Sequence, residues 1–268
     1  MKFQIDHDYH IHSGLSLCSN DPEQTPERIL AYGVQNGFKK LCLTDHYWDE
    51  RVSGMEEFFF YHDQNTEHIR RALPLPQSEN CTFLFGCETD MSADGRIGLS
   101  PERYGDFDFI IVPTTHMHLN PYTYPFDRED KAVRAKDYVL RFESLLRSDL
   151  PFHKTGLAHM TCALIQKENR AYLDVLNLIP DSAFADLFEE SAKLGLGIEL
   201  NMGLGELNDP ASRDTVLRPY FIAKEKGCRF YLGSDAHHPA GLDAAMGRFT
   251  AMVDALSLTE EDKFYIGE

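Results

Sequence analysis

Two short segments far apart in the chain carry residue types that bind metal ions. The first is HIH (residues 10–12) and the second is GSDAH (residues 233–237). Residues i and i+2 of an extended segment face the same side, so the two histidines of the first segment can point together, as can the aspartate and histidine of the second. Imidazole and carboxylate ligands suit Zn, Mn or Fe. The alternative for the second segment is a helix start, with Ser234 or Asp235 as the N-cap before Pro239.

Five further apolar runs are also followed by residues that can bind metal ions. These residues are Asp45, His46, Glu88, His116, His118, His159, Glu199 and Asn201. In α/β barrels, functional groups gather at the carboxyl ends of the strands, where the loops meet a common mouth. We therefore expect side chains that are distant in the sequence to converge there. A shared carboxylate such as Glu88 suits two ions about 3.5–4 Å apart.

Strand-like and helix-like segments alternate along the chain. Short apolar runs predict strands at residues 2–10, 40–44, 82–87, 107–114, 155–158, 197–200 and 228–232. Amphipathic spacing and capping residues predict helices at residues 26–36, 131–147, 182–194, 210–226 and 240–256. This order is typical of parallel βαβ units in a barrel or a doubly wound sheet. No GxGxxG follows the first strand, which favours the barrel.

The composition is that of a packed globular protein with an acidic balance. Of the 268 residues, 43% are hydrophobic and 26% are charged, and the formal net charge is −17. Nucleic acids and anionic membranes attract basic patches, so we expect neither as a partner. The six cysteines lack CxxC spacing, and we find no secretory signal or membrane-spanning apolar run. We therefore expect reduced thiols and a cytoplasmic location.

Six motifs together resemble the polymerase and histidinol phosphatase (PHP) family of metal-dependent phosphoesterases. They are DYHIHS (8–13), LTDH (43–46), GCE (86–88), TTHMH (114–118), GLAH (156–159) and GSDAH (233–237). The resemblance implies a distorted TIM-like (β/α)7 barrel, here a single domain over residues 1–268. It also implies two to three divalent ions (Zn, Mn or Fe) at the carboxyl ends of the strands.

The resemblance implies a role for each matching residue. The first ion would be held by His10, His12, Glu88 and Asp235. The second would be held by Glu88, His116 and His159, and the third by His46 and His237. The residues implied in catalysis are Glu88, Asp235 and His237. The family often has His or Asp six residues after the second histidine of the first motif, where this chain has Cys18. Either Cys18 binds as a thiolate, or Asp21 replaces it, or the third site is weak.

Other polar residues near the predicted strand ends are candidates for orienting the ligands or contacting substrate. They are Asp45, His118, Asn201 and His238. Residues 120–127, rich in aromatics and proline, form either a wall over the site or an ordered surface loop. The aromatic run at residues 55–62 favours core packing or a dimer contact. Candidates for phosphate contacts in loops near the mouth are Arg96, Arg128 and Arg213.

The function expected from these features is hydrolysis of a small phosphate monoester, similar to a histidinol phosphatase. A hydroxide bridging two metal ions would attack phosphorus, and the ions would offset the charge that develops. The alternative reaction on the same scaffold is hydrolysis of a lactone or amide. A third hypothesis, from another class, is a non-catalytic binding module that the metal ions stabilise. An arginine cluster near the ions would favour phosphate, whereas an apolar mouth would favour the lactone or amide.

Overall fold

The central strands are all parallel and form two sheets. The computed structural model describes residues 1–19, 21–125 and 128–267. One sheet contains β1 (His7–Ile11), β2 (Lys40–Leu43) and β4 (Thr82–Phe85), in that order. The other contains, in order, β3 (His46–Tyr47), β5 (Cys87–Thr89), β6 (Ile110–Val112), β7 (Thr155–Leu157), β8 (Gly197–Leu200) and β9 (Arg229–Leu232). The result is a mixed α/β architecture that is consistent with a TIM-like fold.

The two sheets are joined by the chain itself, because β2 leads directly into β3 and β4 into β5. Between β4 and β5 lies Gly86, where a Cβ atom would come within 2.5 Å of the Phe109 carbonyl oxygen. At the other edges, the tips of β1 and β9 are linked by two backbone hydrogen bonds. Asp235 donates to the His10 carbonyl at 2.7 Å, and His12 donates to the Ala236 carbonyl at 3.1 Å. These links bring the carboxyl ends of the first and last strands together.

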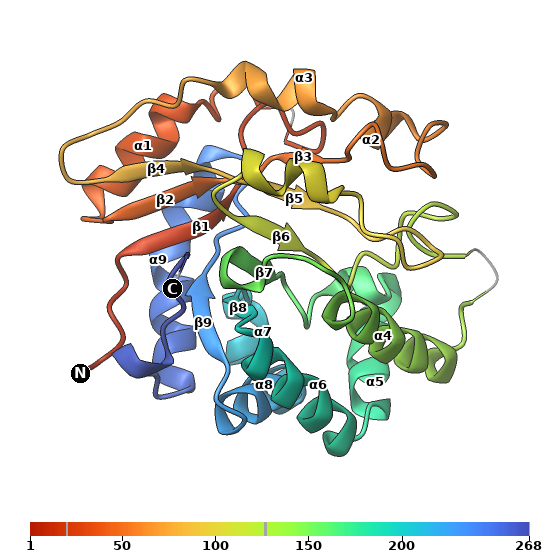
Figure 1. The fold of residues 1–268 in the computed structure, drawn as a ribbon. Coiled ribbons are helices and arrows are strands. Elements are labelled where there is room, and N and C mark those ends of the chain that lie inside the picture. Colours follow the sequence, from red (N-terminus) through yellow and green to blue (C-terminus); the bar gives the residue numbers. More distant parts are fainter. Residues whose placement is uncertain (20, 126–127, 268) are drawn as a thin grey trace.

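Helices lie outside the strands. They are α1 (Pro26–Gln35), α2 (Phe59–His62), α3 (Thr66–Ile69), α4 (Lys131–Leu146), α5 (Ala171–Leu178), α6 (Asp181–Leu194), α7 (Leu204–Asn208), α8 (Pro210–Glu225) and α9 (Pro239–Ala255). Figure 1 shows α4, α6 and α8 on one side of the strands and α1 and α3 on the other. Apolar side chains between the helices and the strands form the main core. Among the described residues, none of the helices combines the length and apolar character needed to cross a membrane.

Local signals explain where the long helices begin and end. Thr25 caps α1, because its side chain accepts a hydrogen bond from the Arg28 amide, and Pro26 occupies the first turn. At its other end, α6 stops at Gly195, whose φ of 79° is in the left-handed region that glycine adopts at low cost. These capping residues are visible in the sequence, and each predicted helix is present within one residue of its predicted ends.

The predicted strands are all present, although several are shorter than expected. The first was expected over residues 2–10 but begins at His7, because Lys2 forms only an isolated antiparallel bridge with Thr259. The fourth was expected over residues 107–114 and pairs only as Ile110–Val112. The two sheets do not share a continuous hydrogen-bonded ladder within the described residues. The (β/α)7 barrel therefore stays a prediction.

Candidate metal centre

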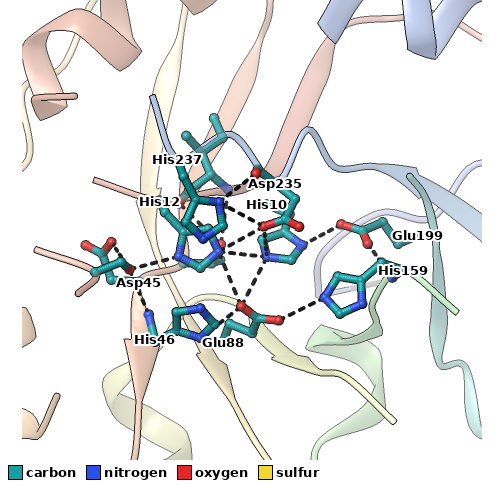
Figure 2. A network of polar contacts seen from close by, with 12 residues as sticks. His10, His12, Asp45, His46, Glu88, His159, Glu199, Asp235 and His237 are labelled. Carbon is teal, nitrogen blue, oxygen red and sulfur yellow. Dashed lines mark hydrogen bonds and ion pairs between the residues drawn. The ribbon is translucent and has the colours of Figure 1, made fainter. Parts of the chain in front are cut away.

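The Glu88 carboxylate lies at the centre of the imidazole cluster (Figure 2). Strand β5 places this side chain in the interior, where it is almost fully buried. Its Oε2 atom lies 3.4 Å from His10 Nε2 and 3.3 Å from His12 Nε2. The same oxygen lies 3.1 Å from His46 Nδ1. One carboxylate oxygen thus faces three imidazole nitrogens from β1 and β3.

The second oxygen of Glu88 faces a different pair of histidines. Its Oε1 atom lies 3.2 Å from His159 Nε2, beyond the end of β7, and 3.9 Å from His116 Nε2, beyond the end of β6. The rings of these two histidines stack with their centroids 5.0 Å apart. A carboxylate whose two oxygens face separate donor groups has the geometry of a bridging ligand.

Asp235 and His237 complete the cluster from the loop after β9. Asp235 Oδ1 lies 3.4 Å from His10 Nε2 and 3.2 Å from His12 Nε2. His237 stacks on His12 with ring centroids 4.1 Å apart, and its Nδ1 donates to the Asp235 carbonyl oxygen at 2.9 Å. The loop after β9, in which Asp235 has a positive φ, therefore turns both side chains toward the carboxyl end of β1.

The donor atoms form three groups within which all atoms lie within 4.8 Å of one another. The groups are His10, His12, Glu88 and Asp235; then Glu88, His116 and His159; then His12, His46 and His237. The first two groups contain the same residues as the first two implied sets, and the third contains His46 and His237 with His12 in addition. The structure thus brings together eight of the nine predicted ligands.

Two histidines of the cluster each donate a hydrogen bond from Nδ1 to a buried carboxylate, while Nε2 faces the cluster. His10 Nδ1 donates to Glu199 Oε1 at 2.6 Å, and the Glu199 side chain on β8 is fully buried. His116 Nδ1 donates to Asp90 Oδ2 at 2.8 Å. Such partners fix the tautomer and the orientation of a ligating imidazole. Both rings therefore present Nε2 to the cluster.

Hydroxyl groups hold two further rings. His12 Nδ1 donates to Ser16 Oγ at 2.9 Å, and Ser16 Oγ donates to Asp45 Oδ1 at 2.7 Å. His159 Nδ1 and Thr115 Oγ1 are 2.9 Å apart. Asp45 thus reaches His12 through one serine, which places it behind the donor groups. This position agrees with an orienting role for Asp45.

A buried aspartate also ties the first strand to the last loop. Asp8 Oδ1 accepts hydrogen bonds from the Ser234 amide at 2.9 Å and from the His10 amide at 3.3 Å. Its Oδ2 accepts from Tyr32 at 3.1 Å. Burial raises the pKa of Asp8 to about 6, although the hydrogen bonds from Ser234, His10 and Tyr32 oppose the rise. Asp8 therefore helps to position two segments of the cluster.

Opposite charges dominate the electrostatics of the cluster. Burial alone would raise the pKa of Glu88, but His46 and His10 hold it well below its usual range. Burial would lower the pKa of His10, but Glu199 and Asp235 raise it well above the usual value. For His46, burial prevails and the pKa falls well below the usual value. The Glu88 carboxylate is therefore ionised at neutral pH, as metal binding requires.

These residues fit a cluster of divalent metal ions. The His10 and His12 Nε2 atoms lie 3.0 Å apart, and both rings already use Nδ1 for hydrogen bonds to Glu199 and Ser16, so both Nε2 atoms are directed at the same point. The buried His46 Nδ1 lies 3.1 Å from Glu88 Oε2 but makes no hydrogen bond of acceptable geometry. Buried polar atoms are normally paired, and a divalent ion between this nitrogen and the carboxylate would satisfy both. Imidazole and carboxylate donors suit Zn, Mn or Fe.

The cluster opens into a cavity of about 200 Å³. Its lining includes six residues of the donor groups: His46, Glu88, His116, His159, Asp235 and His237. Apolar or aromatic side chains also line it, namely Phe60, Tyr61, Leu119 and Leu164. Cys18 and His118 complete the lining. Among the described lining residues there is no lysine or arginine.

The remaining predicted site residues lie at different distances from the donor groups. Cys18 is exposed and lines the cavity without joining any of the three groups, so its ligand role stays a prediction. Asp21 accepts a hydrogen bond from the Glu23 amide in a local turn. His118 lines the cavity, and burial lowers its pKa to about 3. Asn201 has a buried Nδ2 atom without a hydrogen-bond partner.

Several other candidates face elsewhere. His238 is exposed and caps α9, where its side chain accepts a hydrogen bond from the Gly241 amide. Arg96 pairs with Asp94, and Arg128 donates to Asp137, so neither lines the cavity. Arg213, in α8, does not line it either. Part of the predicted wall at 120–127 falls on residues 126–127, which lie outside the described residues.

Sequence reasoning did not assign roles to Glu199 and Asp90. An ionisable residue within the short apolar strand Gly197–Leu200 is a signal that was available for Glu199, because such a residue is rarely buried without a partner. Asp90 follows Glu88 at i+2, the same spacing that identified the paired histidines of β1. Neither signal identifies the histidine that each carboxylate contacts, because His10 and His116 are brought to them only by folding.

The fold and the cluster define a class: an α/β protein whose histidine and carboxylate side chains could hold divalent metal ions at the carboxyl ends of parallel strands. Within this class, the chain belongs to the PHP domain family, whose model matches residues 8–202. Asp235 and His237 lie beyond the matched segment. The search of curated proteins gave no significant match.

Two solved structures show the same fold. One is the histidinol phosphate phosphatase from Lactococcus lactis subsp. lactis, solved as a complex with zinc, L-histidinol and phosphate. It has 14% identity and a TM-score of 0.54, and the match covers 97% of this chain and 98% of that chain. The other is a proposed histidinol phosphatase from Listeria monocytogenes, with 14% identity and a TM-score of 0.62. That match covers 91% of this chain and 100% of that chain.

Proposed function

We propose that this protein is a metal-dependent hydrolase of small phosphate monoesters. The observation that carries the proposal is the Glu88 carboxylate, whose two oxygens face separate groups of imidazole donors. Membership of the PHP domain family supports the proposal. The similar structure with zinc, L-histidinol and phosphate supports a small phosphate ester as substrate. The net charge of −17 is consistent with the absence of a nucleic-acid partner.

In the proposed reaction, the oxygen of a water molecule forms a bond to phosphorus. The bond from phosphorus to the alcohol oxygen breaks, that oxygen keeps the electron pair and takes up a proton, and the products are the alcohol and inorganic phosphate. Divalent ions held at the centre supply Lewis-acid charge for this step and make water more acidic. Two or three ions of Zn, Mn or Fe suit the donor groups.

The side chains of this chain have separate tasks in the proposal. Glu88 and Asp235 supply the negative charge that holds the ions, and their low pKa values keep them ionised. Glu199 keeps the Nδ1 proton of His10 in place, so that Nε2 stays free to bind. His237 lies at the cavity, and burial lowers its pKa to about 4, so its imidazole is neutral and available as a ligand at pH 7.

We extend the proposal to the architecture as a single (β/α)7 barrel domain over residues 1–268. The support is the pair of hydrogen bonds between the tips of β1 and β9, together with the parallel bridge between Ile11 and Ala236. A cooperative unfolding transition that is the same by circular dichroism and by fluorescence would agree with one domain.

Metal content and phosphatase activity test the function together. Protein purified without chelator should contain two to three equivalents of Zn, Mn or Fe and hydrolyse p-nitrophenyl phosphate and histidinol phosphate. Glu88→Gln should lose most of the metal and at least about a hundredfold in kcat/KM, because bound metal supplies several kcal/mol to such reactions. The control is Glu225→Gln, an exposed glutamate at the end of α8. Full activity of the Glu88→Gln protein would refute the proposal.

A second candidate is hydrolysis of a lactone or an amide. The observation in its favour is the lining of the cavity, which includes four apolar or aromatic residues and, among the described residues, no lysine or arginine. The same ions would polarise a carbonyl oxygen instead of a phosphoryl oxygen. A screen of lactones beside phosphate esters decides between the two. A higher kcat/KM for a lactone than for every phosphate ester would favour this candidate.

A further inference from the structure

One side of the metal-centre cavity is built from apolar side chains. Phe60, Leu119 and Leu164 are half-buried and line the cavity that also contains Glu88. They come from the segments that follow β3, β6 and β7. The ring of Phe60 meets the ring of His46 edge to face, with centroids 5.3 Å apart. The apolar wall, defined as Phe60, Leu119 and Leu164, therefore adjoins the donor groups.

The wall is held in place by packing and hydrogen bonds. Phe58, two residues before Phe60, stacks on Tyr122 with centroids 4.2 Å apart and planes within 7°. This stack joins the segment after β3 to the segment after β6. Tyr61 donates from its hydroxyl to Asp90 Oδ2 at 2.9 Å. Asp90 is also the partner of His116, so the segment that carries Phe60 and Tyr61 shares a buried anchor with the donor groups.

The charges around the cavity disfavour a substrate with a second anionic group. No lysine or arginine lines the cavity among the described residues. Lys167 is close enough to lower the pKa of His118 but does not line the cavity. One phosphate group can be balanced by the ions, but a second would meet no lysine or arginine among the described residues that line the cavity. A polyhydroxylated group would lose hydrogen bonds to water that apolar side chains cannot replace.

Resting on the proposed function, we propose that the wall selects the alcohol part of the substrate. The substrate class is a phosphate monoester of an apolar alcohol, whose aryl or alkyl group packs on Phe60, Leu119 and Leu164. Burial of apolar surface in this contact supplies the selectivity. The phosphate group points toward the donor groups, and the apolar group lies against the wall.

Two primary alkyl esters of similar leaving-group basicity test the selection. The metal-loaded protein should hydrolyse 2-phenylethyl phosphate with a kcat/KM at least about tenfold above that for glycerol 3-phosphate, since small apolar differences in a pocket give about 10–200-fold discrimination. Phe60→Ala should lower kcat/KM about tenfold for the first ester and less than about twofold for the second. Leu164→Ala should shift the ratio in the same direction, which guards against an effect on folding.

The matched control is Phe59→Ala, the adjacent aromatic residue, which is 72% exposed and does not line the cavity. It should leave both rates unchanged. Equal rates for the two esters in the unaltered protein, or an equal loss of both in Phe60→Ala, would overturn the selection by the wall while leaving the phosphatase proposal intact.

Calorimetry with two phosphonates gives a second readout that needs no turnover. 2-Phenylethylphosphonate should bind at least about tenfold more tightly than methylphosphonate, and Phe60→Ala should remove the difference. If neither ester is hydrolysed, the proposed function fails. The binding difference then still decides whether the wall recognises apolar groups, and equal binding would overturn that recognition.

Discussion

At the scale of single residues, the centre is built in two layers. The inner layer is the eight donor side chains, and the outer layer holds their rings in position. Glu199 and Asp90 are members of this outer layer, and each accepts a hydrogen bond from the Nδ1–H group of one histidine. Because such contacts choose the tautomer, they decide which nitrogen is available to an ion.

The first prediction concerns Glu199→Gln. A glutamine lacks the negative charge that stabilises the Nδ1 proton of His10 at Glu199 Oε1. Glu199 Oε2 accepts a hydrogen bond from the His159 amide at 2.6 Å. A glutamine can offer an oxygen to only one of these two donors, and its NH2 group would face the other. We expect metal affinity to fall about 10–100-fold, as for other partners of ligating histidines. Competition with a calibrated chelator measures the affinity. Unchanged affinity, with the exposed Glu225→Gln as reference, would contradict the role.

The second prediction concerns Asp8, which is fully buried. Burial raises its pKa to about 6 from 3.8, so the folded state binds its proton more tightly than the unfolded state. The contribution of protonated Asp8 to the free energy of unfolding is fully present below the pKa of the unfolded state, 3.8, and is lost as pH rises through about 6. Relative to Asp8→Asn, the metal-free protein should therefore lose about 1 kcal/mol between about pH 5 and about pH 8. Urea unfolding of both proteins measures it, and a pH-independent difference would contradict the prediction.

The donor residues were predictable, and their partners were not. His10 and His12 follow from i+2 spacing in a strand, and the order of the six motifs identifies the other donors. Glu199 contacts His10 from a segment far away in the sequence, and Ser16 contacts His12 around a tight turn. The spacing of residues within a strand predicts neither contact. The apolar wall was also missed in part, because residues 55–62 were expected to favour core packing. Phe58 and Tyr61 do pack inward, while Phe60 lines the cavity.

At the scale of elements, the strand tips depart from regular geometry where they present the ligands. His159 has a φ of 25° and Asp235 a φ of 52°. Non-glycine residues pay a conformational cost in this region, and such residues cluster at functional sites. The backbone hydrogen bond from Asp235 to His10 helps to hold the second tip in this conformation.

The third prediction concerns Gly233, which precedes this tip. A Cβ atom at this position would overlap the Glu199 carboxylate and approach His10 Cβ to 2.8 Å. Gly233→Ala should therefore displace the Glu199 contact and lower the unfolding free energy by about 1–3 kcal/mol, as overpacking does. Chemical denaturation and metal titration measure both effects. Gly205→Ala is the control, because a Cβ there meets no atom within 4 Å. Equal behaviour of the two variants would contradict the prediction.

Long helices were predicted well, and short or irregular elements were not. Helix α4 is flanked by Asp130, whose side chain caps it, and the sequence pattern gave its start correctly. Helix α5 was missed because it follows Asn169 and Arg170, both with positive φ, and has no side-chain N-cap. Its first turn therefore lacks the residues that mark a helix start. Its position depends on packing against α4 and α8, which is a property of the folded chain.

At the scale of the whole molecule, the centre concentrates carboxylates that need compensating charge. Within the described residues, the cluster brings Glu88, Glu199 and Asp235 around His10. Protonated imidazoles can compensate them when metal is absent, and ions compensate them better because each carries two positive charges. Binding of ions should therefore stabilise the fold.

The fourth prediction is that chelation lowers thermal stability. Binding at a concentration 100 times the Kd contributes about 2.7 kcal/mol. For a chain of this size, the melting temperature should fall by roughly 5–10 °C when a chelator removes the ions. Scanning calorimetry with and without chelator measures the shift, and re-addition of the metal should reverse it. An identical melting temperature in both conditions would contradict the presence of a tightly bound cluster.

The contact between the end of β1 and the loop after β9 has a consequence for biosynthesis. While the chain is being made, His10 and His12 leave the ribosome early, but the aspartate that completes their group is 223 positions beyond His12. A nascent chain therefore exposes an incomplete set of ligands for most of its translation. Under the proposed function, we expect tight metal uptake to be a late event in the maturation of this protein, after the final βα unit has been synthesised.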